Sequence, residues 1–189
     1  MDPKLVKDGV RAILQGLGID LSHPDFRETP DRVAAMYKEI LTPPAIRWAM
    51  FPGKGCEEMI VLNGHHVWSF CPHHLLPVEM QVSVAYIPKS TSRLPGLSKV
   101  PRLIEHKARR LVLQEAVAVD IVDTMMNKLR LLGCACFIKG RHMCMTMRGV
   151  KTASIVTTSA LRGVFLTKPE VRQEFLNLIQ NGGNGGKAH

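Results

Sequence analysis

Aromatic residues are scarce in this chain of 189 residues, at 5% of the sequence. Long apolar runs are absent as well: no stretch reaches the roughly 18 apolar residues of a membrane-spanning helix, and the N-terminus lacks a charged-then-apolar signal pattern. Five cysteines are an odd number in a chain long enough to fold without disulfides, so free thiols or metal ligands are expected. These absences predict a cytoplasmic protein without a membrane partner.

Acidic residues are also few: 16 Asp and Glu stand against 25 Lys and Arg, which gives a net charge of +9. Residues 89–151 hold 13 basic and 4 acidic residues, whereas the rest of the chain holds 12 of each sign. A solvated basic face is the ordinary explanation of such an excess, but its confinement to one third of the chain favours a local anionic ligand. With 46% apolar and 22% charged residues, the chain is typical of a globular protein.

Two segments near the N-terminus have the apolar spacing of amphipathic helices, residues 5–17 and residues 29–41. We expect Thr29 to be the N-cap of the second helix and Pro30 its first residue, because this pair is a common helix start. The Pro-Pro pair after residue 42 ends that helix.

Four later segments are rich in β-branched and apolar residues and predict strands: 58–70, 78–88, 134–147 and 152–165. Between the second and third, helical spacing runs from Pro101 to Leu132, which is too long for one ordinary helix, so a break is expected at 111–114. Paired strands that flank a helix pair favour an α+β fold with an antiparallel sheet over alternating βαβ units.

A possible metal site is divided between two segments. The run Cys-Pro-His-His at 71–74 follows a strand, and His142 and Cys144 lie two residues apart in the strand expected at 134–147, hence on one of its faces. If these segments meet, Cys71, His74 and Cys144 form a Cys₂His set with an open fourth position, as in catalytic zinc sites. Taken alone, the first segment is as often incidental as metal-binding.

The remaining cysteines and the other histidine pair are weaker candidates. Cys134 and Cys136 lie in an apolar run and are expected in the core. His65 and His66 are adjacent, so in a strand they point to opposite faces and are not expected as ligands of one ion.

The basic third contains a candidate phosphate site. Ser98, Lys99 and Arg102 lie at the expected start of a helix, where free backbone N–H groups, the helix dipole and cationic side chains all attract an anion. A solvated basic turn explains this spacing equally well. Glu115 in the same region could accept hydrogen bonds from a guanine edge.

Taken together, the motifs strongly resemble GTP cyclohydrolase I of the zinc-dependent type. They are, in order, CPHH, VAYIPK, GLSKVPRLIEHKARR, LQEA, HMCMTMRGVK and TTSALRGVF, and the resemblance runs from about residue 28 to 165 and weakly to 179. It implies the tunnelling fold, in which two hairpins form a four-stranded antiparallel sheet around a helix pair. We therefore expect an N-terminal helical segment 1–50, a catalytic domain 51–180 and a flexible tail 181–189.

The resemblance also implies an activity, the hydrolysis of GTP to formate and 7,8-dihydroneopterin triphosphate, the first step of folate, pterin or deazapurine synthesis. It assigns one zinc ion per subunit to Cys71, His74 and Cys144, whose bound water would attack C8 of the purine. The catalytic residues implied are His73, His142 and Ser98. A histidine titrates near neutrality, so His73 and His142 could each protonate a departing ring nitrogen or the ribose oxygen.

For the substrate, the resemblance implies a triphosphate site and a guanine site. The triphosphate positions are Ser98, Lys99, Arg102 and Arg148, and the guanine positions are Glu115 and the backbone around Gln114. The family assembles as a toroidal homodecamer of two pentamers, with active sites built from residues of neighbouring subunits. Neither nucleic acid nor a membrane is an expected partner.

One residue departs from the family pattern. Pro72 occupies the position after the first zinc cysteine, where the family usually has Glu, so no carboxylate is available there. Two other hypotheses stay open from the sequence: a nucleic-acid-binding protein that uses residues 89–151, and a structural zinc module with a catalytically altered site. The scarcity of aromatic stacking residues between residues 89 and 130 argues against the first.

Overall fold

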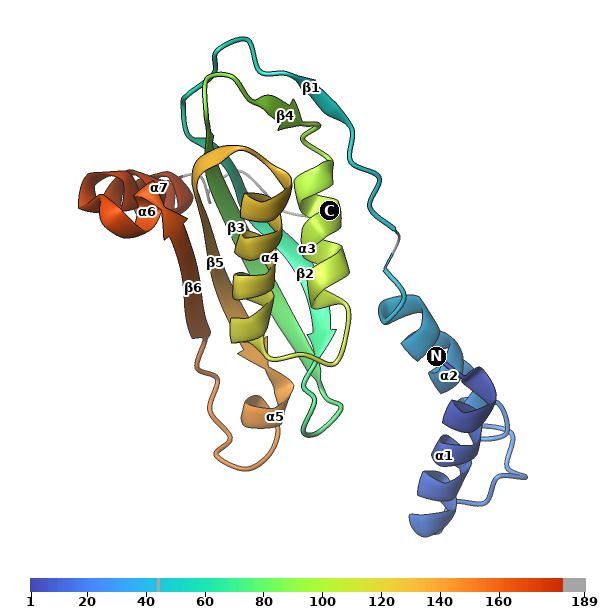
Figure 1. Ribbon diagram of the computed structural model, residues 1–189. Helices are drawn as coiled ribbons and strands as arrows, with labels where there is room; N and C mark the ends of the chain where they lie inside the picture. Colours follow the sequence, from blue (N-terminus) through green and yellow to red (C-terminus); the bar gives the residue numbers. More distant parts are fainter. Residues whose placement is uncertain (44, 182–189) are drawn as a thin grey trace. The chain divides into compact units, whose positions relative to one another are not determined.

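The computed structural model describes residues 1–43 and 45–181 (Figure 1). The chain divides after Pro43 into two compact units. The first unit is a pair of helices, α1 (Pro3–Gly16) and α2 (Thr29–Ile40). Asp2 caps α1 by accepting hydrogen bonds from the amide N–H groups of Lys4 and Leu5, at 2.9 and 3.2 Å. No helix among the described residues is long and apolar enough to cross a bilayer.

The expected N-cap of α2 was wrong by one residue. Thr29 is already helical, Glu28 precedes it as the N-cap, and Pro30 is the second helical residue. The Thr29 hydroxyl points back and donates to the carbonyl of Asp25 at 3.5 Å, so it does not accept from the first turn. A residue in helical conformation cannot cap its own helix in that way.

A four-stranded antiparallel sheet forms the second unit, in the order β2-β3-β5-β6. Its strands are β2 (Ile60–Phe70), β3 (Pro77–Pro88), β5 (Leu131–His142) and β6 (Val156–Gly163). The helices α3 (Lys99–Ala108) and α4 (Gln114–Lys128) lie between the two hairpins in sequence and cover one face of the sheet (Figure 1). This confirms the α+β class, the tunnelling-fold topology and the break between the two helices.

The central strand β3 alternates between two apolar clusters. Its even-numbered residues from Val78 to Tyr86 are buried against α3 and α4. On the opposite face, Ala85 and Ile87 pack with Phe165 and Phe175, whose rings meet edge to face at 5.9 Å. These two rings come from the short helix α6 (Val164–Thr167) and from α7 (Pro169–Asn181), neither of which was predicted from the sequence.

The strand expected at 134–147 begins and ends earlier than its sequence indicates. Pairing of β5 with β3 ends at His142, because β3 itself begins one residue before the paired Val78. Residues Met143–Thr146 then form a single helical turn, α5, in which the Thr146 hydroxyl donates to the carbonyl of His142 at 3.1 Å. Once no neighbouring strand is available, the backbone satisfies its own hydrogen bonds.

Other boundaries differ by a few residues. Strand β6 is shorter than the expected 152–165, α3 begins at Lys99 before Pro101, and α4 ends at Lys128. Two short strands that were not predicted, β1 (Met50–Pro52) and β4 (Arg93–Pro95), pair with each other. The expected tail lies outside the described residues after Asn181.

The two ends of the sheet carry different connections (Figure 1). At one end lie α5 and the turn 71–76 between β2 and β3; this is called the turn end. At the other end β3 leads into β4 and the start of α3; this is called the β4 end. Helix α3 runs between them, since the carbonyl of Arg110, just after the helix, accepts from the Ser69 hydroxyl near the end of β2 at 2.9 Å.

Candidate active site

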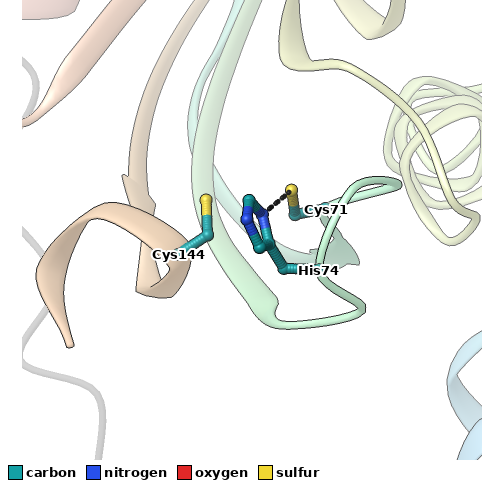
Figure 2. A group of neighbouring side chains, drawn as sticks. All are labelled: Cys71, His74 and Cys144. Carbon is teal, nitrogen blue, oxygen red and sulfur yellow. Dashed lines mark hydrogen bonds between the residues drawn. The ribbon is translucent and has the colours of Figure 1, made fainter. Parts of the chain in front are cut away.

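Three candidate metal ligands meet at the turn end. Cys71 and His74 come from the turn after β2, and Cys144 comes from α5, so the cluster joins the two hairpins (Figure 2). One potential ligand atom from each residue lies within 4.8 Å of the other two. Sγ of Cys71 is 3.7 Å from Nδ1 of His74. The structure therefore brings together the set that the two sequence segments suggested.

The turn itself returns His74 to Cys71. The amide N–H of Leu75 donates to the carbonyl of Cys71, and the amide N–H of Cys71 donates to the carbonyl of Leu76, both at 2.9 Å. Leu75 has a φ of 54°, in the left-handed region that a leucine rarely adopts. The turn thus holds a strained residue directly after the histidine, and its two hydrogen bonds stabilise that conformation.

The chemistry and spacing of the cluster fit zinc. Two thiols and one imidazole are typical zinc donors, and tetrahedral zinc with bonds of about 2.0 to 2.3 Å keeps its ligand atoms about 3.5 to 3.8 Å apart. The observed separation of 3.7 Å between Cys71 and His74 agrees with this. Burial raises the pKa of the Cys144 thiol, and its hydrogen bond with Cys71 raises it further. A bound cation would oppose both effects by stabilising the thiolates.

His73 and Arg148 flank the cluster. Nδ1 of His73 is 3.8 Å from Sγ of Cys71, and the His73 side chain is exposed. The Arg148 guanidinium donates to Nε2 of His74 at 2.9 Å. Arg148 therefore lies at the turn end, although 74 residues separate it from its partner. Pro72 is exposed in the same turn.

His142 is held by a residue whose role sequence reasoning missed. Nε2 of His142 lies 2.9 Å from the amide oxygen of Gln114, whose side chain is buried at 2% exposure. Burial lowers the pKa of His142, and the negative charge of Glu115 partly opposes this shift. Glu115 itself is exposed on the first turn of α4. Gln114 was expected near the substrate, and no sequence signal indicated this contact with His142.

Three of the four expected triphosphate residues lie elsewhere. Ser98 precedes the first residue of α3, Lys99 begins the helix and Arg102 follows on its first turn, all at the β4 end. With a rise of about 1.5 Å per residue, α3 separates its two ends by about 15 Å. Ser98 and Lys99 therefore lie about the length of α3 away from the turn end, where Arg148 and the Cys/His cluster are found.

The weaker candidates lie apart from the cluster. His65 contacts Glu105 on α3 at 3.3 Å, while His66, on the opposite face of β2, lies 3.4 Å from the side chain of Gln81. Cys134 and Cys136 are fully buried, which confirms their expected place in the core, and burial raises the pKa of both thiols.

Comparison with known proteins gives one family. The sequence profile described as GTP cyclohydrolase I matches residues 6–180. A protein of Dehalococcoides mccartyi named GTP cyclohydrolase 1 is 41% identical over 187 residues, which cover 96% of this chain and 99% of the relative. A protein of the same name from Caldanaerobacter subterraneus subsp. tengcongensis is 40% identical over 186 residues, with 96% and 98% covered. Among solved structures, the apo archaeosine synthase QueF-Like is 19% identical with a TM-score of 0.45, over 56% of this chain and 93% of that one.

Proposed function

The chain belongs to the GTP cyclohydrolase I family, and from this premise we propose that it hydrolyses GTP to formate and 7,8-dihydroneopterin triphosphate. The observation that carries the proposal is the cluster of Cys71, His74 and Cys144, with His142 and Arg148 at the same end of the sheet. Family membership over nearly the full length favours this enzyme over a nucleic-acid-binding protein or a structural zinc module.

We propose zinc as the metal, one ion per subunit, held by Cys71, His74 and Cys144. When bound, zinc supplies a Lewis acid that activates a water molecule near neutral pH. The hydrogen bond from Arg148 to Nε2 of His74 requires the hydrogen of a neutral ring to be on Nδ1. A metal at Nδ1 would leave the hydrogen on Nε2, so Arg148 would give up this contact and become available to an anion.

The two remaining histidines of the site are suited to proton transfer. His142 is half-buried and stays largely neutral because burial lowers its pKa, so one ring nitrogen can accept a proton. His73 is exposed beside Cys71 and can exchange protons with both solvent and substrate. Protonating a departing ring nitrogen or the ribose oxygen, and taking that proton back, would be their part in the reaction.

Guanine recognition is assigned to Glu115. Its carboxylate can accept hydrogen bonds from N1–H and from the exocyclic amine of guanine, and adenine offers no such pair. Two features support this role: Glu115 is exposed, and its charge acts on the half-buried His142. The base would thus be bound next to the proton-transferring histidine.

We propose that neighbouring subunits complete the triphosphate site, as in a toroidal decamer. The position of Ser98, Lys99 and Arg102 at the β4 end supports this, because they belong to the start of α3 and Arg148 lies at the turn end, beyond the other end of that helix. A second copy could present its α3 start to the turn end of the first. Ser98 would then serve catalysis as well as phosphate binding.

The proposal extends to the setting of the reaction. We place the enzyme in the cytoplasm, at the first step of folate, pterin or deazapurine synthesis. Within the chain, residues 51–180 would form the catalytic domain and residues 1–50 an N-terminal helical segment.

The direct test is to incubate the purified protein with GTP and zinc and to measure formate and dihydroneopterin triphosphate. Cys144→Ala should abolish both stoichiometric zinc and formate release. Cys56→Ala is the matched control, because Cys56 is partly exposed outside the cluster, and it should keep both. Zinc-independent formate release by Cys144→Ala would rule the proposed mechanism out.

A further inference from the structure

We infer that Gln114 is a positioning residue that fixes the orientation and tautomer of His142; this inference rests on the proposed function. Gln114 is the first residue of α4, and its side-chain amide connects this helix to two strands. The amide contacts His142 at the end of β5 and Thr158 in β6. Its side chain is 2% exposed, so it is not open to a ligand in the way that Glu115 is.

The groups around the amide determine which way it faces. Its nitrogen lies 3.1 Å from the carbonyl oxygen of Val156, 3.1 Å from the hydroxyl of Thr158 and 3.4 Å from the carbonyl oxygen of Ile138. Carbonyl oxygens only accept hydrogen bonds, so only the NH₂ group of Gln114 can face them. The amide oxygen is therefore directed to His142.

The amide oxygen in turn determines the tautomer of the ring. An amide oxygen only accepts, so Nε2 of His142, 2.9 Å away, must carry a hydrogen. In the neutral ring, Nδ1 then keeps the lone pair and is the nitrogen that can accept a proton. Gln114 thus has the role of an orienting group behind a general base.

Gly140 provides the space for this contact. A Cβ atom at this position would lie 1.9 Å from the amide oxygen of Gln114 and 3.3 Å from Nε2 of His142. Any side chain at residue 140 would therefore displace the amide from the ring. A glycine usually weakens a strand, but the missing side chain near the end of β5 has a specific use here.

The first test is kinetic. Gln114→Met keeps the length of the side chain and removes the acceptor, so we expect kcat to fall about 10- to 100-fold, with zinc content unchanged and KM for GTP within about threefold. Gly140→Ala should also lower kcat at unchanged zinc content and nearly unchanged KM, because the new methyl group would displace the amide of Gln114. With two independent variants, the test remains valid if one of them does not fold. A rise in KM at unchanged kcat would instead make Gln114 a substrate contact and overturn the inference.

A double-mutant cycle separates positioning from general structural damage. If Gln114 acts through His142, then Gln114→Met should cost less than about twofold when added to His142→Ala. Val122→Ala is the control, because Val122 is a buried residue of the same helix outside this contact: it should lower the melting temperature without lowering kcat. Full additivity of the Gln114 and His142 effects would contradict the inference.

A crystal structure of zinc-loaded Gln114→Met gives a readout independent of turnover. The His142 ring should leave its wild-type orientation in that variant, whether or not the protein acts on GTP. An unmoved ring would overturn the inference even if the variant is slow, whereas a moved ring in the variant together with a wild-type protein that releases no formate would reject only the proposed function.

Discussion

The two ends of the sheet differ in how their functional side chains are held. At the turn end they hold one another: Cys71 contacts His74, His74 accepts from Arg148, and His142 is bound by Gln114. At the β4 end, the side chains at the start of α3 make no hydrogen bond or ion pair within residues 1–43 and 45–181. These are Ser98, Lys99 and Arg102.

This difference indicates a division of labour. Groups that move protons or bind a metal must be oriented before the substrate arrives, and internal hydrogen bonds provide that orientation. Cations that bind a phosphate gain most when they are free of internal partners, because no existing contact must be broken. Substitution of the proton-transferring His142 at the turn end should therefore lower kcat, and substitution of a phosphate-binding cation at the β4 end should raise KM.

The largest effect is expected at the turn end. His142→Ala should lower kcat by about 10² to 10⁴-fold, the usual contribution of a general acid or base, while zinc content stays stoichiometric. Steady-state formate release and metal analysis measure the two quantities. If KM rises and kcat does not change, His142 belongs to substrate binding and the proposed division between the ends fails.

A smaller effect is expected at the β4 end. Arg102→Ala should raise KM for GTP about 10- to 100-fold, the value of one hydrogen bond to a charged group, with kcat nearly unchanged. Arg130→Ala is the matched control: it removes the same charge from an exposed residue next to β5, at the same end, and should change KM less than about twofold. Equal effects in both variants would indicate general charge attraction instead of a site.

A mixture of a turn-end variant and a β4-end variant tests whether one active site takes both ends from the same chain or from two chains. His142→Ala and Arg102→Ala are unfolded together, refolded as a mixture and assayed at subsaturating GTP. Because a heterologous interface pairs different surfaces of two copies, mixed assemblies would contain some sites with both residues intact. Activity above that of either parent is expected; activity equal to their average would place both ends of the site in the same chain.

The smallest effect is expected at Pro72. Pro72→Ala should lower the free energy of unfolding by only about 0.4 to 1 kcal/mol, since proline restricts the unfolded chain and the exposed ring lies outside the ligand set. Thermal unfolding and zinc analysis of the variant would measure this. Loss of zinc would show that the proline shapes the turn around Cys71 and His74 more strongly than its exposure indicates.

Patterns of local sequence predicted much of the fold. The strand predicted at 78–88 corresponds to β3, and the helix break predicted at 111–114 corresponds to the gap between α3 and α4. The end of β5 could not be read in the same way, because it depends on where its partner β3 begins. The run from Met143 to Thr146 looks like a continuing strand until no partner is left.

The candidate site was predicted unevenly for a similar reason. Cys71, His74 and Cys144 have side chains whose chemistry is visible in the sequence. Gln114 has an ordinary side chain, and its importance comes from its contacts with His142 and Thr158, which lie 28 and 44 positions further along the chain. Gly140 is recognised only when its missing Cβ is placed in three dimensions. Such supporting contacts are long-range, and no local spacing encodes them.

The ligand set also connects metal binding to the order in which the chain folds. Cys71 and His74 belong to the first hairpin, but Cys144 follows β5, and helices α3 and α4 lie between them. A nascent chain that ends before β5 holds only two of the three donors. Full affinity therefore arises only after the second hairpin pairs with the first, and the metal stabilises that finished pairing by mass action. Metal retention would then report that the two halves of the sheet have joined.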